Sequence, residues 1–139
     1  MANTAVESGP RLIAFVLPSI PESVPVARFH VRATLGFHGL GEYANDIETI
    51  TSELVTNAVR HVCDDGTETI GLALARAWNP AAVTIIVSDS SPEGPIRRDT
   101  PPDSEQGRGL QIVEALSARW GWRRQDGGKA IFATLAREA

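Results

Sequence analysis

The chain has 139 residues, 42% of them hydrophobic and 22% charged, which is typical of one soluble globular domain with its own hydrophobic core. Its formal net charge of −4 argues against a general nucleic-acid-binding protein, because such a protein needs a basic surface to neutralise phosphates. The single cysteine excludes an internal disulfide, and no apolar run approaches the roughly 20 residues that cross a bilayer. Since the first residues also show no signal-peptide pattern, we expect a cytoplasmic protein that contacts neither DNA nor a membrane.

The first part of the chain is predicted to form a strand and a helix. Residues 1–10 are mostly small and polar, so we expect a flexible leader before a single domain over residues 11–139. The apolar run 11–17 lies between two prolines, which favours a strand. A helix is then predicted from Ser23, as its N-cap, to about Phe37. Its buried side would contain Val26, Phe29 and Leu35, with Val31 as a further candidate.

A second helix, from about Tyr43 to Val62, carries the apolar periodicity on which the rest of the interpretation depends. Its apolar residues recur at steps of three and four, as in an amphipathic helix: Ile47, Ile50, Leu54 and Ala58. Glu53 and Asn57 lie four residues apart, so both side chains project from one side of the helix, at the edge of the apolar stripe. There they could face solvent, a metal or a phosphate, although most isolated Glu-x-x-x-Asn pairs are ordinary solvated residues.

The second half of the chain is predicted to form two hairpins, separated by a long loop and a helix. Residues 68–77 alternate in polarity and residues 82–88 are rich in β-branched side chains, which favours an antiparallel hairpin. Residues 89–106 have no periodic apolar signal, and such a long segment inside a compact domain is usually functional or disordered. A helix is expected at 110–120 and two strands at 120–124 and 130–135. We expect three tryptophans to pack on the sheet, namely Trp78, Trp120 and Trp122.

The order of these elements predicts the fold class. Two hairpins separated by helices favour a mixed, mostly antiparallel sheet with the helices on one face. The result is an α/β (α+β) two-layer sandwich. A doubly wound fold is disfavoured because strand follows strand twice.

Two further features add to the Glu53 and Asn57 pair. Asp89 ends the most hydrophobic strand, and its carboxylate only accepts hydrogen bonds, which suits an exocyclic amino group such as that of adenine. Taken alone, an Asp after a strand is more often a turn residue. Gly107 and Gly109 flank Arg108 before a helix that begins with Leu110, where glycines let a ligand approach and free N–H groups suit a polyphosphate. Taken alone, Gly-x-Gly is most often a loop-to-helix joint.

Taken together, these features predict a nucleotide site. The side-chain oxygen of Asn57 is a hard ligand that suits Mg²⁺ beside phosphates, and Asp89 would read the base. The loop 90–106 would close over the phosphates. Glu53 is then available to orient or deprotonate an attacking water or hydroxyl as a general base.

Four motifs resemble the successive boxes of the histidine-kinase-like ATPases. They are Glu53-Leu-Val-Thr-Asn57-Ala-Val-Arg-His61, Val87-Ser-Asp89, Gly107-Arg-Gly109-Leu110 and Gly128-Lys-Ala-Ile-Phe132. Within that group, the chain resembles the single-domain anti-sigma factor kinases of Gram-positive bacteria, especially the actinobacterial type. The resemblance covers nearly the whole chain, and the four motifs in this order are more specific than any one of them.

The resemblance implies a Bergerat-type site for ATP and Mg²⁺. By position, Asn57 would be the Mg²⁺ residue, Glu53 the catalytic base and Asp89 the adenine reader. Gly107, Arg108, Gly109 and Leu110 would lie at the lid and phosphates, and His61 close to the nucleotide. The implied partners are a sigma factor, which is held inactive, and an anti-anti-sigma protein, which is phosphorylated on Ser or Thr. A homodimer is also implied.

The chain departs from the family pattern at two positions. Ser91 stands where the family often has Gly, which would stiffen the base pocket or weaken binding, and Ala130 replaces a Thr whose hydroxyl can help to bind the base. These departures keep a second hypothesis open, a non-catalytic ATP-binding or vestigial partner-binding module. A stand-alone ATPase that drives conformational change is disfavoured, because no second domain is seen to which motion could be transmitted.

Overall fold

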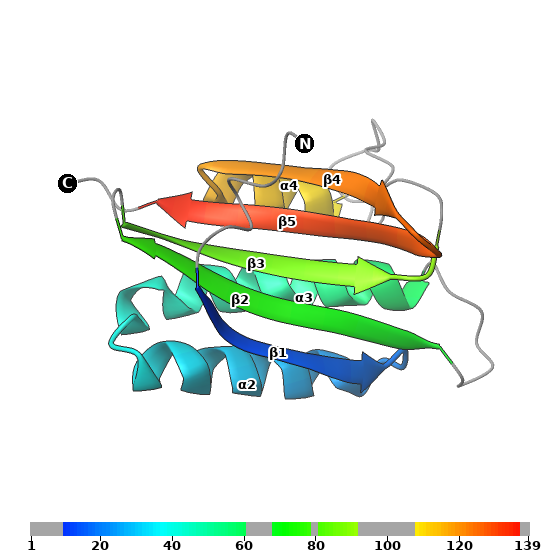
Figure 1. Ribbon diagram of the computed structural model, residues 1–139, viewed down its shortest axis with the longest axis horizontal. Helices are drawn as coiled ribbons and strands as arrows, with labels where there is room; N and C mark the ends of the chain where they lie inside the picture. Colours follow the sequence, from blue (N-terminus) through cyan, green and yellow to red (C-terminus); the bar gives the residue numbers. More distant parts are fainter. Residues whose placement is uncertain (1–9, 61–67, 79–80, 92–107, 137–139) are drawn as a thin grey trace.

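The computed structural model describes residues 10–60, 68–78, 81–91 and 108–136, which form three α-helices, one 3₁₀ turn and five strands (Figure 1). In chain order these elements are β1 (Arg11–Pro18), α2 (Ser23–Phe37), η1 (Gly41–Tyr43), α3 (Ala44–Arg60), β2 (Thr69–Trp78), β3 (Ala81–Asp89), α4 (Arg108–Leu116), β4 (Arg119–Gln125) and β5 (Gly128–Ala136). Every helix and strand expected from the sequence is present, with boundaries that differ by a few residues. The predicted end of the second helix, Val62, lies outside the described residues.

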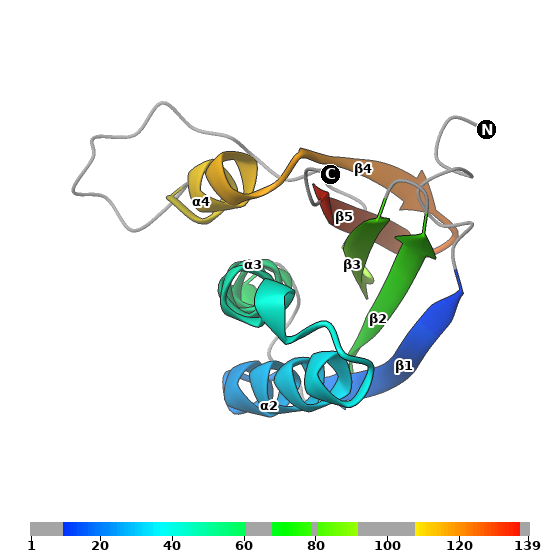
Figure 2. The same cartoon turned by 90° about the vertical axis from the view of Figure 1, so that its left-hand side faces the viewer.

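The five strands form one sheet in the order β1-β2-β3-β5-β4, and each pairing between the described strands is antiparallel. Figure 2 shows α2, α3 and α4 side by side on one face of this sheet. The α/β sandwich with its helices on one face is therefore confirmed. The two short hairpin connections, β2 to β3 and β4 to β5, allow neighbouring strands to pair antiparallel without a crossover.

The main core lies between the sheet and the helices, as the periodicities require. Side chains at alternate positions of β2 and β3 point toward the helices, and Ile70, Leu74 and Ile85 are fully buried there. Ile47 and Ile50 of α3 are fully buried against them. Burial of each such side chain contributes roughly 1.5–3 kcal/mol, so α3 is held mainly by its apolar stripe.

Helix α2 differs from the prediction in which side it buries. Val26 and Phe29 are exposed, whereas the stripe that faces the core consists of Ala27, Val31 and Leu35, all with no exposed surface. The prediction that Val26 and Phe29 are buried is wrong, because the buried residues of α2 follow a four-residue step on which the small residue Ala27 lies and Val26 and Phe29 do not.

The start of α2 also differs from the prediction. Glu22 occupies the N-cap position and Ser23 is the first helical residue, so Ser23 is not the N-cap. The Ser23 hydroxyl donates instead to the carbonyl oxygen of Pro18 at 2.6 Å, which ties the helix to the end of β1.

Two expectations about the remaining aromatic residues and α4 are corrected. Helix α4 ends at Leu116, because the next residues turn into β4 and the Ala118 N–H already donates to the sheet, at the Thr134 carbonyl. Trp120 therefore lies in β4, where it packs against the core as expected. Trp78 does not pack on the core: it is 68% exposed, and the Arg76 guanidinium lies 3.6 Å from its ring centre. Within the described residues, no helix has the length and apolar character to cross a membrane.

Candidate functional site

Four element ends meet at one end of the molecule. Figure 1 shows that α3 and β3 both finish at this end, and that α4 and β5 both begin there. Asn57 lies in the last turn of α3, and Asp89 is the last residue of β3. The fold thus brings to one end the four elements that carry the sequence motifs.

Asp89 is buried at the end of β3, with only 2% of its side chain exposed. It alternates with Val87, a residue of the core under the helices, so its carboxylate lies on the helix side of the sheet. Its Oδ1 accepts two hydrogen bonds, one from the backbone N–H of Ser91 at 2.8 Å and one from Lys129 Nζ at 3.0 Å. The first of these closes an Asx turn, so Asp89 serves as a turn residue as well as a candidate binding residue.

Lys129 lies in the fourth motif, but the sequence alone assigned it no role. It pairs with Asp89 across the β3–β5 ladder, and its side chain has no exposed surface. A buried ammonium needs a counter-charge, and Asp89 supplies it. A signal was available in the sequence, because the one lysine of the chain lies at the start of an apolar strand, where a charge requires a partner.

Gly128 lets β5 begin directly beside Asp89. A Cβ atom at this position would lie 1.8 Å from the Asp89 carbonyl oxygen, far inside van der Waals contact. Only a residue without a side chain fits here. The glycine before the lysine thus sets the approach of the two strands on which the Lys129–Asp89 pair depends.

The two departures from the family pattern, Ser91 and Ala130, occupy different positions relative to Asp89. Ala130 packs with Ile86 and Phe132 on the sheet face opposite to the helices, so a hydroxyl there would point away from the Asp89 carboxylate. Ser91 is buried and donates its N–H to Asp89. Outside the glycines, no residue in the described part of the chain has a positive φ, so the backbone at Ser91 does not require the freedom of glycine.

On α3, the side chains of Glu53 and Asn57 are half-buried. Glu53 lines a groove of about 440 Å³ between α2 and α3, in which the neighbouring carboxylate, Glu48, accepts hydrogen bonds from Arg28 and Arg32. Because both guanidinium groups already pair with Glu48, no described contact uses them to neutralise Glu53. A carboxylate at the wall of a polar groove can accept a proton from a hydroxyl that enters the groove.

The remaining predicted residues belong to the start of α4 and to the end of α3. Arg108 is the first residue of α4, Gly109 follows in its first turn, and the Leu110 side chain is buried. Backbone N–H groups at such a helix start are suited to bind phosphate oxygens. Gly107 and His61 lie outside the described residues.

A metal would have few protein ligands at this site. Among the described residues there is no cluster of three His, Cys, Asp or Glu side chains that could hold a metal ion. Mg²⁺ commonly binds through one or two protein oxygens together with substrate phosphates and water. Asn57 alone therefore fits Mg²⁺ that arrives with a nucleotide, rather than a resident metal.

Comparison with known families gives one result. The model of the family described as histidine kinase-like ATPase domain matches residues 17–135, a range that contains all four sequence motifs. A comparison with curated proteins gives no significant match.

Proposed function

The chain belongs to the family of histidine kinase-like ATPase domains, and from this membership we propose that it is an ATP-dependent protein serine/threonine kinase that acts as an anti-sigma factor. The family match supports ATP binding. The observation that supports the rest of the proposal is the common end of α3, β3 and α4. Asn57 lies in the last turn of α3, Asp89 ends β3, and Glu53 precedes Asn57 by one helical turn.

In this proposal three groups bind Mg-ATP. The Asp89 carboxylate accepts a hydrogen bond from the adenine amino group, and the start of α4 binds phosphate oxygens through its backbone N–H groups. The Asn57 side chain supplies an oxygen ligand to Mg²⁺. The bound nucleotide supplies the phosphoryl group, and its metal neutralises the charge that develops during transfer.

Glu53 is proposed as the general base. Its carboxylate takes the proton of the attacking Ser or Thr hydroxyl as the hydroxyl oxygen bonds to the γ-phosphorus and the bond to the ADP oxygen breaks. The products are a phosphoprotein and ADP. In this proposal the partner side chain reaches Glu53 from the groove between α2 and α3.

A phosphotransfer assay tests this role. Glu53→Gln should lower transfer to the partner by about 10²–10⁴-fold, which is the usual contribution of a positioned base, while the Kd for ATP stays within about twofold. Glu48→Gln is the matched control, since it removes a carboxylate from the same groove and should leave transfer intact. Asn57→Ala should weaken Mg-ATP binding itself. Equal losses in Glu53→Gln and Glu48→Gln would refute the assignment of the base.

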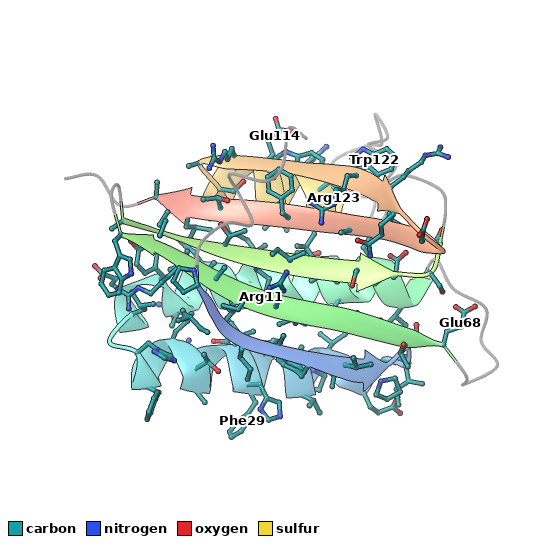
Figure 3. All side chains as sticks on the ribbon, viewed as in Figure 1. Arg11, Phe29, Glu68, Glu114, Trp122 and Arg123 are labelled. Carbon is teal, nitrogen blue, oxygen red and sulfur yellow. The ribbon has the colours of Figure 1, made fainter. Side chains whose placement is uncertain are left out.

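The proposed protein partners are a sigma factor, an anti-anti-sigma protein and a second copy of the chain. Three large apolar side chains on α2 support a protein interface: Val26, Phe29 and Phe37 are between 42% and 86% exposed. Figure 3 shows Phe29 on the outer side of α2, directed away from the sheet. Exposed apolar groups at helical spacing commonly mark an interaction site.

Light scattering after size exclusion tests the homodimer. Replacement of Phe29 and Phe37 together by Ser should shift the chain toward monomer without a loss of thermal stability, because both rings are exposed. Trp78→Ser is the matched control, since it removes an exposed aromatic ring from β2. Co-purification of the wild-type chain would identify the sigma factor and the phosphorylated partner. A dimer that resists the double Phe replacement would exclude this face as the interface.

One observation favours a second candidate, a non-catalytic partner-binding module. The Asp89 carboxylate is already neutralised by Lys129 and is almost fully buried, so it has less need of a ligand than an open carboxylate has. Calorimetric titration with Mg-ATP separates the two candidates. Absence of both heat and thermal shift would favour the non-catalytic module.

A further inference from the structure

The two carboxylate oxygens of Asp89 differ in their protein contacts. Oδ1 accepts from Ser91 N at 2.8 Å and from Lys129 Nζ at 3.0 Å, so both of its lone pairs are used. In the described part of the structure, no protein donor reaches Oδ2. Oδ2 is therefore the one carboxylate oxygen without a described protein donor, and as a carboxylate oxygen it can only accept a hydrogen bond from a ligand.

We propose that Lys129 is a positioning residue that makes the nucleotide site selective for adenine over guanine. The inference rests on the proposed function, in which Asp89 meets the base. Lys129 occupies Oδ1 and leaves Oδ2 as the single acceptor, which matches the one amino group that adenine presents at its sixth position.

Guanine does not match this arrangement. It carries an oxygen acceptor at the sixth position, and its adjacent N–H and amino group are two donors that require two acceptors side by side. With Oδ1 held by Lys129 and Ser91, guanine would leave at least one buried polar group without a partner. The selectivity for adenine thus depends on the hydrogen bond from Lys129 to Asp89 Oδ1, which makes Oδ1 unable to accept from the base.

The position of Lys129 fixes this contact. Lys129 and Asp89 are partners in the ladder of β3 and β5, and Gly128 brings the two backbones together. The ammonium has no exposed surface, so it acts through Asp89. It is a positioning residue and touches no ligand.

The experiment measures ADP and GDP binding by calorimetry for the wild type, Lys129→Met and Lys129→Arg, each checked for folding by circular dichroism. We expect the wild type to prefer ADP. In Lys129→Met the ratio of the GDP Kd to the ADP Kd should fall about tenfold or more, because one hydrogen bond to a charged group is worth at least that factor. Lys129→Arg, which keeps a cationic donor, should restore much of the ratio.

A further variant keeps the test decisive where Lys129→Met does not fold. The double variant Asp89→Asn/Lys129→Met buries no charge. The amide at position 89 offers guanine one donor and one acceptor, so the ratio of the GDP Kd to the ADP Kd must fall in this variant as well. If the folded variants keep the wild-type ratio of the GDP Kd to the ADP Kd and show only a lower melting temperature, the proposal is overturned. Lys129 then has a structural role alone. A wild type that binds neither nucleotide overturns the proposed function itself, and the selectivity with it.

Discussion

Replacement of Lys129 by Met leaves the Asp89 carboxylate buried without its counter-charge. In the wild type the two groups are 3.0 Å apart, with 0% and 2% of their side chains exposed, so water cannot take the place of the missing ammonium. Removal of one partner from a buried ion pair typically costs about 3–5 kcal/mol. Folded domains are stable by only about 5–15 kcal/mol, so the variant should lose a large part of its stability.

The melting temperature measures this loss. An unfolding entropy of about 2.1 cal/mol/K per residue implies a shift of about 3.4 °C per kcal/mol for a chain of this length, and so a fall of about 10–17 °C. The control is the double variant Asp89→Asn/Lys129→Met, which buries no charge and should be clearly more stable than Lys129→Met. A single variant that melts within 3 °C of the wild type would refute the account of the pair, as would a double variant less stable than either single one.

Two further predictions concern packing around the same strands. Gly128→Ala should destabilise the fold by about 3 kcal/mol or more, because its Cβ would collide with the Asp89 backbone, whereas Gly36→Ala, at an open helical position in α2, should stabilise by about 0.5–1 kcal/mol in a urea titration. The hydroxyls of Thr84 and Thr134 bond each other at 2.8 Å in a buried position. Thr84→Val should therefore cost about 1–3 kcal/mol in the same titration, and the Thr84→Val/Thr134→Val pair should cost less than the single variant.

The sequence predicted the elements and the layer order well, because the signals involved are local. The recurrence of apolar residues at steps of three and four from Ile47 to Leu54 places α3 against the sheet, and the alternation in β2 and β3 gives the hairpin. The burial of Phe29 was predicted wrongly because it depends on tertiary packing and not on a local signal. Helix α2 has apolar residues on more than one side, and only the position of the helix against β1 and α3 decides that Ala27 faces inward. A helical period cannot choose between two apolar stripes.

The site was predicted less completely than the fold. Asp89 was predicted as a binding residue because a carboxylate after a buried strand is visible in the sequence. Its pairing with Lys129 is not visible there, because 40 residues separate the two and only the β3–β5 register brings them together. The same register puts Ala130 on the face opposite to the helices, because successive residues of a strand face opposite sides of the sheet.

That alternation of strand faces determines which contact can distinguish the kinase hypothesis from the hypothesis of a non-catalytic module. Ala130 faces away from the helices and Ser91 keeps its N–H on Asp89, so neither departure takes the carboxylate from the site. The contact that remains to distinguish the two functions is the one between Lys129 and Asp89. If the ammonium replaces the adenine amino group, the wild type gives no heat with Mg-ATP and Lys129→Met, in its folded form, gains binding. If the ammonium positions the carboxylate, the wild type binds Mg-ATP and Lys129→Met loses its selectivity for adenine. One titration series with these two proteins therefore decides whether Lys129 competes with the adenine amino group for Asp89 or positions Asp89 for it.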